Sequence, residues 1–406
     1  MNKKLTIILL VLTIILLGLL AIVLIDNKKP DNNVTTKEAD SPQYNTDNFS
    51  NQEVDSSKDV VNLPQIEETL TDIDNTDDNK PIEDQVSPTP AAPIVLAFAG
   101  DINFDEDSKP VARYDREGKG ILGGISKELV DEMNMADIFM LNNEFAYSSR
   151  GTRIVEKSYT FRAHPKRVEI LKEMGADIVS LANNHALDFG VDALIDTFTT
   201  LDEAGIDYVG AGNNIDRAKA PIYYNIGDTK IAYLAASRVI YAMDWYATDD
   251  RPGMIGTYDP ALLVASIKEA KENSDLVVVY VHWGVERTHE LVDYQKNMAR
   301  SYIDAGADIV IGCHPHVMQG LEFYKGKPIA YSLGNYWFNS AKRESGLLKY
   351  YFNSDGTYEL QLLPAMNDNT YTYLITDEND KKAYYEFMER ISFDVRFDED
   401  GFILEQ

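Results

Sequence analysis

Residues 306–317, GADIVIGCHPHV, place two histidines directly after a short apolar run. The run begins after Gly306 and ends at His314-Pro315-His316, and its length and β-branched residues are typical of a buried strand. In an extended segment, residues two apart point the same way, so we expect both imidazoles to face one site, with proline fixing the local geometry. Histidines grouped at a strand end favour a metal site, and a surface-loop pair that binds nothing is the alternative.

Four further apolar runs also end in side chains that bind metals. They lead to Asp101 (VLAFAGD), Glu144 (IFMLNNE), Asn184 with His185 (SLANNH) and His282 (VVVYVH). Because ligands collect at the carboxyl ends of strands in an open α/β sheet, we expect one shared site. Imidazole, carboxylate and amide together suit Mn, Fe or Zn. The sequence therefore predicts a hydrolytic centre holding one or two divalent ions. Its expected ligands are Asp101, Glu144, Asn184, His282, His314 and His316.

Several of these residues have simpler interpretations, which the sequence leaves open. Either Asp101 or Glu144 could be the N-cap of a following segment, and His282 alone is typical of a hydrogen-bonded core histidine. We expect His185 to act as a general acid with a pKa near the working pH. Asp188 either orients His185 or starts the next helix, where an acid suits the helix dipole. Three asparagines are expected to form turns, to support the metal ligands or to contact substrate: Asn103, Asn142 and Asn335.

Other chemistries find little support in the chain. There is no G-x-S-x-G nucleophile elbow, and Cys313 follows a strand without a partner base, so we expect it to be a small packed residue. The sequence contains no P-loop and no dinucleotide fingerprint. Residues 93–406 carry 50 acidic and 31 basic side chains, a net charge of −19, which argues against nucleic-acid binding.

Helical and strand-like segments alternate along most of the chain, which predicts an α/β fold with covered sheets. Glycine follows two of the helical segments, as expected for a left-handed C-terminal cap. The helix–strand pairs are 166–174 with 178–182, 261–271 with 276–281, and 299–305 with 309–311. The last quarter instead predicts hairpins around one helix, and we expect residues 341–406 to complete a second sheet. Its expected elements are strands 347–352 and 357–363, helix 381–388, and strands 391–397 and 401–404.

The N-terminal quarter differs in composition from the rest. Residues 5–25 are uncharged, and as a helix they would span the roughly 30 Å core of a bilayer. A cleaved signal peptide is the alternative, but its apolar region is usually about 7–15 residues long. We expect residues 1–4 in the cytoplasm, a single-pass anchor, and the C-terminal part outside the cell membrane. Residues 26–92 are acidic and polar, which predicts a disordered spacer ahead of a domain at 93–406.

Seven motifs, taken in order, resemble the CapA/PgsA proteins of poly-γ-glutamate capsule biosynthesis, a branch of the calcineurin-like metallophosphoesterase superfamily. The motifs are FAGDINF, NNEFAYS, SLANNHALDFG, VGAGNN, VHWGVE, GADIVIGCHPHV and IAYSLGNYWF. The resemblance implies a two-sheet sandwich flanked by helices (αββα), with metals at the strand ends. It implies that Asp101 bridges the metals or binds the first one, that His316 also binds the first metal, and that Glu144 occupies the bridging position. It assigns a second metal to Asn184, His282 and His314, and leaves His185 as the acid near the leaving group.

Two departures from the superfamily pattern weaken the implied first metal site. Asn103 replaces a metal-binding histidine, and Glu144 is one methylene longer than the usual aspartate. The resemblance implies an anchored metallophosphatase-like protein that acts in polymer synthesis, export or attachment, with an anionic polymer or phosphoester as substrate. It also implies the membrane subunits of a poly-γ-glutamate synthase as partners. A non-catalytic, polymer-binding subunit and a surface phosphoesterase unrelated to capsule are the alternatives, because a fold does not establish an activity.

Overall fold

Two large β-sheets form the centre of the protein. The computed structural model describes residues 92–406. The first sheet has eight strands in the order β18-β17-β16-β1-β2-β5-β6, and β15 pairs with β1. Its bounds are β1 Ile94–Ile102, β2 Ile138–Asn143, β5 Ile178–Ser180, β6 Asp207–Val209, β15 Asn335–Trp337, β16 Arg343–Phe352, β17 Tyr358–Asn367 and β18 Thr372–Leu374. The mixed α/β class predicted from the alternating segments is confirmed.

The second sheet has six strands in the order β13-β14-β12-β11-β9-β8. Its bounds are β8 Ile222–Ile226, β9 Thr229–Ser237, β11 Leu276–His282, β12 Ile309–Cys313, β13 Met318–Tyr324 and β14 Lys327–Leu333. Three two-stranded ribbons complete the strands of the described region. They are β3 Ala146–Tyr147 with β4 Arg162–Ala163, β7 Ala211–Gly212 with β10 Gly253–Met254, and β19 Val395–Phe397 with β20 Ile403–Glu405.

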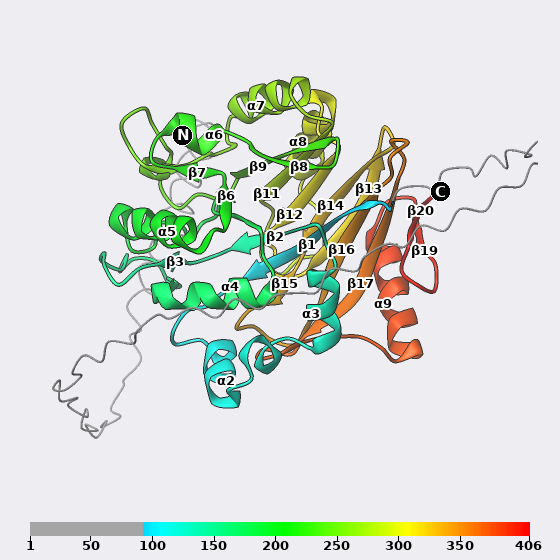
Figure 1. The fold of residues 1–406 in the computed structure, drawn as a ribbon, viewed down its shortest axis with the longest axis horizontal. Coiled ribbons are helices and arrows are strands. Elements are labelled where there is room, and N and C mark those ends of the chain that lie inside the picture. Colours follow the sequence, from blue (N-terminus) through cyan, green and yellow to red (C-terminus); the bar gives the residue numbers. More distant parts are fainter. Residues whose placement is uncertain (1–91) are drawn as a thin grey trace, which may run out of the picture. The chain divides into compact units, whose positions relative to one another are not determined.

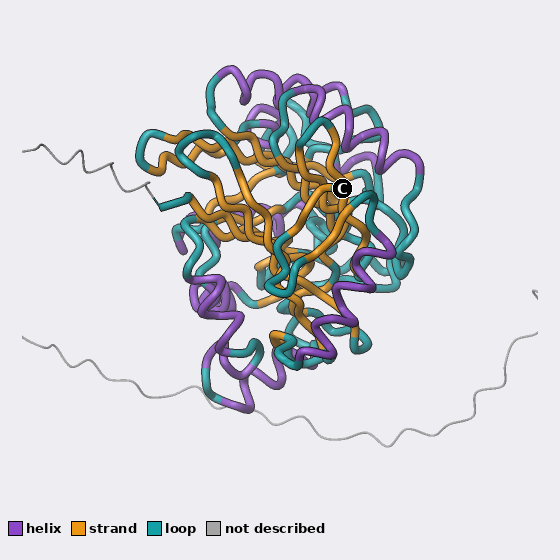
Figure 2. The backbone as a smooth tube through the Cα atoms, turned by 90° about the vertical axis from the view of Figure 1, so that its right-hand side faces the viewer, coloured by secondary structure: helices purple, strands orange, loops and turns teal. Residues whose placement is uncertain are grey.

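Helices lie at the periphery of these sheets (Figures 1 and 2). Their bounds are α2 Lys109–Glu117, α3 Lys127–Asn134, α4 Val168–Met174, α5 Val191–Ala204, α6 Ile215–Lys219, α7 Ala261–Glu272, α8 Asp293–Ala305 and α9 Glu378–Ile391, with 3₁₀ turns at Gly120–Gly123, Pro165–Arg167 and Met243–Trp245. The expected left-handed caps are confirmed, since Gly175 ends α4 with φ 74° and Gly306 ends α8 with φ 119°.

The alternation of side chains along β11 explains why its sequence is apolar throughout. Val277, Val279 and Val281 pack in the cluster that includes α7 and α8. Val278 and Tyr280 instead belong to the core between the two sheets. A strand buried on both faces needs apolar residues at every position. His282, two residues after Tyr280, therefore points toward the space between the sheets.

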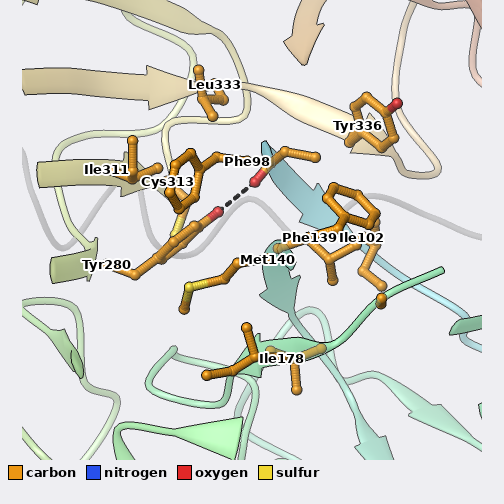
Figure 3. Close-up of a cluster of buried hydrophobic side chains, with 14 of the residues drawn as sticks. Phe98, Ile102, Phe139, Met140, Ile178, Tyr280, Ile311, Cys313, Leu333 and Tyr336 are labelled. Atoms are coloured by element: carbon orange, nitrogen blue, oxygen red, sulfur yellow. Dashed lines mark hydrogen bonds between the residues drawn. The ribbon is translucent and has the colours of Figure 1, made fainter. Parts of the chain in front are cut away.

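The core between the sheets contains aromatic and aliphatic side chains from both of them (Figure 3). The hydroxyl of Tyr280 on β11 donates a hydrogen bond of 2.7 Å to the carbonyl oxygen of Ala99 on β1. This bond joins the two sheets one residue before Gly100 and two before Asp101, so it fixes the position of the β1 end against β11.

The hairpin predicted in the last quarter is confirmed, because β16 and β17 pair antiparallel from Arg343–Asn367 to Phe352–Tyr358. β16 also pairs with β1, so this hairpin extends the first sheet. The predicted helix at 381–388 lies within α9. The last predicted hairpin begins later than expected, since Ile391 still belongs to α9 and the strand starts at Val395.

Within residues 92–406, no helix combines the length and the apolar character needed to cross a membrane. The predicted anchor at 5–25 and almost all of the predicted spacer at 26–92 lie outside the described residues. Both remain predictions.

Gly100 lies where β1 passes close to the turn before β15. A Cβ atom at this position would lie 1.9 Å from the carbonyl oxygen of Gly334, and that carbonyl accepts the N–H of Asp101 at 2.9 Å. We expect Gly100→Ala to lower the free energy of unfolding by about 1–3 kcal/mol, since backbone atoms must shift. Chemical denaturation measures this, with Gly356→Asn as the control, because nothing lies within 4 Å of that turn glycine and asparagine is among the residues that best tolerate its φ of 84°. An unchanged midpoint for Gly100→Ala would contradict the close packing.

Candidate metal centre

The five strand ends named from the sequence meet in one buried region. Asp101 at the end of β1 and Glu144 after β2 are both fully buried. Nδ1 of His316 lies 3.5 Å from Oδ2 of Asp101 and 4.0 Å from Oε2 of Glu144. Nε2 of His282 lies 3.5 Å from Oε1 of Glu144. Side chains more than 200 residues apart in the sequence thus surround one small space.

Glu144 is the central carboxylate of this group. Neither of its buried oxygens has a hydrogen-bond partner among the described residues, although three imidazoles approach it. Burial, followed by the charge of Asp101, raises its pKa well above the usual range. A buried carboxylate whose oxygens accept no hydrogen bond is rare in folded proteins, and three imidazoles around it are typical of a site that binds a metal ion.

His282, His314 and Asn184 form the side of the centre next to β11 and β12. Nε2 of His282 lies 2.6 Å from Oδ1 of Asn184, and the rings of His282 and His314 are 4.6 Å apart. Nδ1 of His314 is buried and has no hydrogen-bond partner within residues 92–406. Burial lowers the pKa of His282 well below its ordinary value and that of His314 to about 3. Both rings are therefore neutral at pH 7, the form that binds metals.

The extended conformation expected for His314-Pro315-His316 is wrong. His314 has φ 96° and His316 has φ 57°, so both residues adopt left-handed backbone that non-glycine residues rarely occupy. Gly284 forms a sharp turn beside them with φ 91°. Strained residues of this kind collect at functional sites, where the surrounding structure holds them in place.

His316 differs from the other histidines in its charge. Burial alone would lower its pKa, but the carboxylates of Glu144 and Asp101 raise it to about 10. Its Nδ1 also lies 2.8 Å from Oδ1 of Asn335, whose Nδ2 is buried without a partner. In this state the protonated His316 supplies one positive charge to two buried carboxylates.

His185 is held by Asp188 and by a lysine that the sequence analysis did not identify. Nδ1 of His185 lies 2.6 Å from Oδ2 of Asp188. Lys157 Nζ donates to Oδ1 of Asp188 at 2.5 Å and to the carbonyl oxygen of Asn184. Because α5 starts at Val191, the interpretation of Asp188 as a helix start is wrong. Nε2 of His185 faces Glu144 at 4.0 Å.

The pKa of His185 does not match the expectation that it lies near the working pH. Burial, the largest cause, and the nearby charge of Lys157 both lower this pKa, which is about 4. Asp188 opposes both effects. In this state, His185 is neutral at pH 7 and its Nε2 faces the centre as a proton acceptor, since Nδ1 contacts a carboxylate.

Amide side chains fix Asp101 and its neighbours. Nδ2 of Asn142 donates to Oδ1 of Asp101 at 2.7 Å, and Asn183 donates to Oδ1 of Asn142 at 3.1 Å. Asn183 cannot be singled out from the sequence, because two adjacent asparagines give no sign of which one faces inward. Asn103 serves a turn, since its Oδ1 accepts the N–H of Asp105 at 2.8 Å.

Two groups of side chains have the spacing needed to hold an ion. Ligand atoms of Glu144, His314 and His316 lie within 4.8 Å of one another, and those of a second group, Asp101, His282 and Cys313, do so as well. Cys313 is fully buried, as expected of a packed residue, but its Sγ also lies 3.2 Å from Nδ1 of His282. The unpaired atoms of Glu144 and His314 and the mixed donor set fit a divalent transition metal. Neither Asp101 nor Glu144 is an N-cap of a described helix.

A cavity of about 340 Å³ adjoins this centre. His185, His316 and Asn335 line it, and the rings of Phe161 and Phe338 lie 4.2 and 4.8 Å from His185 and His316. A larger cavity of about 490 Å³, between the ends of β17 and β18 and α9, contains none of the strand-end ligands. The smaller cavity is therefore where a ligand would meet the centre.

Lys157 provides a test of how His185 is held. We expect Lys157→Met to raise the pKa of His185 from about 4, because a nearby positive charge is removed. The variant also breaks a buried ion pair, which costs about 3–5 kcal/mol. Asp188 keeps its contacts with His185 and the N–H of Phe161, so it is not left wholly unpaired. We therefore expect a smaller loss in the free energy of unfolding, about 2–3 kcal/mol. NMR titration of His185 in EDTA measures the shift, with the exposed Lys166→Met as control. An unchanged pKa would show that Lys157 does not act on this ring.

Solved structures similar to this chain have low sequence identity to it. A hypothetical protein from Thermus thermophilus is 16% identical with a TM-score of 0.42, and the match covers 66% of this chain and 99% of that one. The NAD nucleotidase of Haemophilus influenzae is 10% identical with a TM-score of 0.40, covering 74% of this chain and 63% of that one.

Curated relatives are closer in sequence. The capsule biosynthesis protein CapA of Bacillus anthracis is 35% identical over 237 residues, and the PGA biosynthesis protein CapA of Bacillus subtilis is 36% identical over 213 residues. These matches cover 57% and 52% of this chain, and little more than half of each relative, 57% and 56%. A family described as bacterial capsule synthesis protein PGA_cap matches residues 95–340, which contain every strand-end ligand. This chain therefore belongs to the bacterial capsule synthesis protein family PGA_cap.

Proposed function

We propose that this protein is a metal-dependent, metallophosphoesterase-like hydrolase that acts in poly-γ-glutamate capsule biosynthesis. The observation that carries the proposal is Glu144, a buried carboxylate without hydrogen bonds that faces three imidazoles. The names of the two Bacillus relatives support the polymer. Two sheets with helices outside them agree with the αββα arrangement proposed for the domain at 93–406.

The proposed ligands of one or two Mn, Fe or Zn ions are the six strand-end residues: Asp101, Glu144, Asn184, His282, His314 and His316. When bound, such ions supply a Lewis acid for water and for a phosphoryl or acyl oxygen. His185 would move a proton at its Nε2, held in orientation by Asp188. The cavity walls Phe161 and Phe338 would exclude water from this atom.

The same proposal includes location and partners. Residues 5–25 would anchor the chain in the cytoplasmic membrane, and residues 26–92 would hold the domain outside the cell at a distance from it. Membrane subunits of a polymer synthase would be its partners, and the substrate would be an anionic polymer or a phosphoester.

Elemental analysis of the purified full-length chain tests the centre directly. We expect stoichiometric Mn, Fe or Zn in the wild type and a loss of about tenfold or more in metal affinity in His282→Ala and His316→Ala. His164→Ala is the matched control, since His164 is exposed and contacts none of the ligands. A wild-type protein without stoichiometric metal would contradict the proposal.

A further inference from the structure

Two arginines without ionic partners line the cavity that contains His185 and His316. Arg287 lies in the loop after β11, and Arg343 is the first residue of β16. Within residues 92–406, neither guanidinium makes an ion pair or a hydrogen bond. Most other arginines in the described part of the chain do have a partner. Some pair with carboxylates, as Arg150 does with Asp196, Arg167 with Glu106 and Asp115, and Arg300 with Glu322. Others donate to backbone carbonyls, as Arg113 and Arg251 do.

The loop that carries Arg287 is fixed by buried groups. Arg287 has φ 62°, a strained value for this residue type, and its N–H donates to the carbonyl oxygen of Pro315 at 2.8 Å. The buried Gln319 donates to the carbonyl oxygen of Thr288 at 3.1 Å and accepts from the buried Gln295 at 2.8 Å. The loop is therefore tied to the His-Pro-His segment, and Arg287 is held at the cavity although its side chain is exposed.

The other walls of the cavity suit the aliphatic part of a chain-like ligand. Tyr159, Phe161 and Phe338 line it together with Ala341. Apolar walls reduce the local dielectric, which strengthens attraction between a guanidinium and an anion. Glu286 lies on the same rim, so the three charged rim residues together contribute a net charge of +1. The domain around them has a net charge of −19.

We propose that Arg287 and Arg343 bind side-chain carboxylates of a polyacid whose backbone passes through this cavity toward His185 and His316. This inference rests on the proposed function and assigns the residues that select a polycarboxylate. A domain of net charge −19 repels a polyanion at long range, so capture requires local positive charge at the site itself. Guanidinium groups supply it in a form that matches carboxylate geometry with two parallel hydrogen bonds.

Binding of a defined γ-linked glutamate oligomer to the full-length chain tests this assignment. Fluorescence anisotropy would compare the wild type with Arg287→Gln, Arg343→Gln and the double variant. Because both arginines are partly open to solvent, we expect each single change to weaken affinity about 3- to 10-fold and the double change about 10- to 100-fold. Lys342→Gln is the matched control: it removes the same charge one residue away, but Lys342 lines the larger cavity beside α9.

The outcomes separate this assignment from the proposed function. Loss of oligomer binding in the double variant, with metal content and Lys342→Gln unchanged, supports it. It is overturned if the double variant retains wild-type affinity, if Lys342→Gln weakens binding equally, or if a γ-linked isoglutamine oligomer, in which amides replace the free α-carboxylates, binds as tightly as the glutamate oligomer. It is also overturned if the metal-loaded wild type binds inorganic phosphate through these arginines but not the oligomer. Absence of metal from the wild type would instead count against the proposed function.

Discussion

Glu144→Gln is expected to make the metal-free protein more stable while it removes tight metal binding. In the metal-free state, the Glu144 carboxylate is buried without a hydrogen bond and lies in the same buried group as Asp101. Replacing this buried carboxyl, which has no hydrogen-bond partner among the described residues, should raise the free energy of unfolding by about 1–3 kcal/mol at neutral pH. Loss of the central ligand should weaken metal affinity by at least about 100-fold.

The pH dependence of this effect has a definite sign. Burial and Asp101 raise the pKa of Glu144 in the folded state, so the folded protein holds the proton more tightly than the unfolded chain. The stability contributed by this group is complete below its unfolded pKa of about 4.3 and is lost as the pH rises through its folded pKa. The glutamine variant lacks this loss. Its advantage over the wild type should therefore grow from acid toward neutral pH.

Denaturant unfolding in EDTA and with added Mn²⁺ or Zn²⁺ measures both effects. An ion at about 100 times its dissociation constant stabilises the wild type by about 2.7 kcal/mol, and this gain should vanish in Glu144→Gln. Glu286→Gln is the control, since Glu286 lies at the cavity rim but is exposed. A glutamine variant that is less stable without metal, or that keeps the metal-induced gain, would show that Glu144 is not the ion's central ligand.

The strand ends could be predicted because their physical cause is local. An apolar run such as 276–281 has no polar face, which requires a strand covered on both sides. The residue that follows such a run must lie at an edge of the sheet. The same reasoning predicts Asp101, Glu144 and His282 from the sequence, whereas the helices that end at Gly175 and Gly306 are predicted by helical segments followed by a glycine.

The remaining features depend on contacts between distant segments. Lys157 lies in a loop without periodicity, and only the folded chain brings its Nζ to Asp188 and the carbonyl of Asn184. The φ angles of His314 and His316 also depend on their surroundings, since the sequence around a proline favours extended backbone. The turn after β5 decides whether Asn183 or Asn184 faces His282. Because the two side chains are identical, the sequence alone does not show which of them does.

His185→Gln is expected to lower the turnover of a phosphodiester by about 10²–10⁴-fold and to leave the metal content unchanged. His185 is held through Nδ1 by Asp188, and its Nε2 lies 4.0 Å from Glu144, so its replacement should leave the six proposed ligands in place. His164→Gln, an exposed change of the same kind, should alter neither quantity. Steady-state kinetics of the metal-loaded chain, with capsule polymer measured in cells, provide the two readouts.

The pH profile then decides which proton His185 moves. Burial lowers its pKa to about 4 in the free protein, so a step that needs the protonated ring should make kcat/KM fall about tenfold per pH unit above about 4. A step that uses the neutral ring as a proton acceptor should stay level from about pH 5 upward. A His185→Gln variant with normal turnover and normal polymer would remove both possibilities. The buried ligands would then serve stability or polymer binding, and the interaction with Asp188 would only hold the turn before α5.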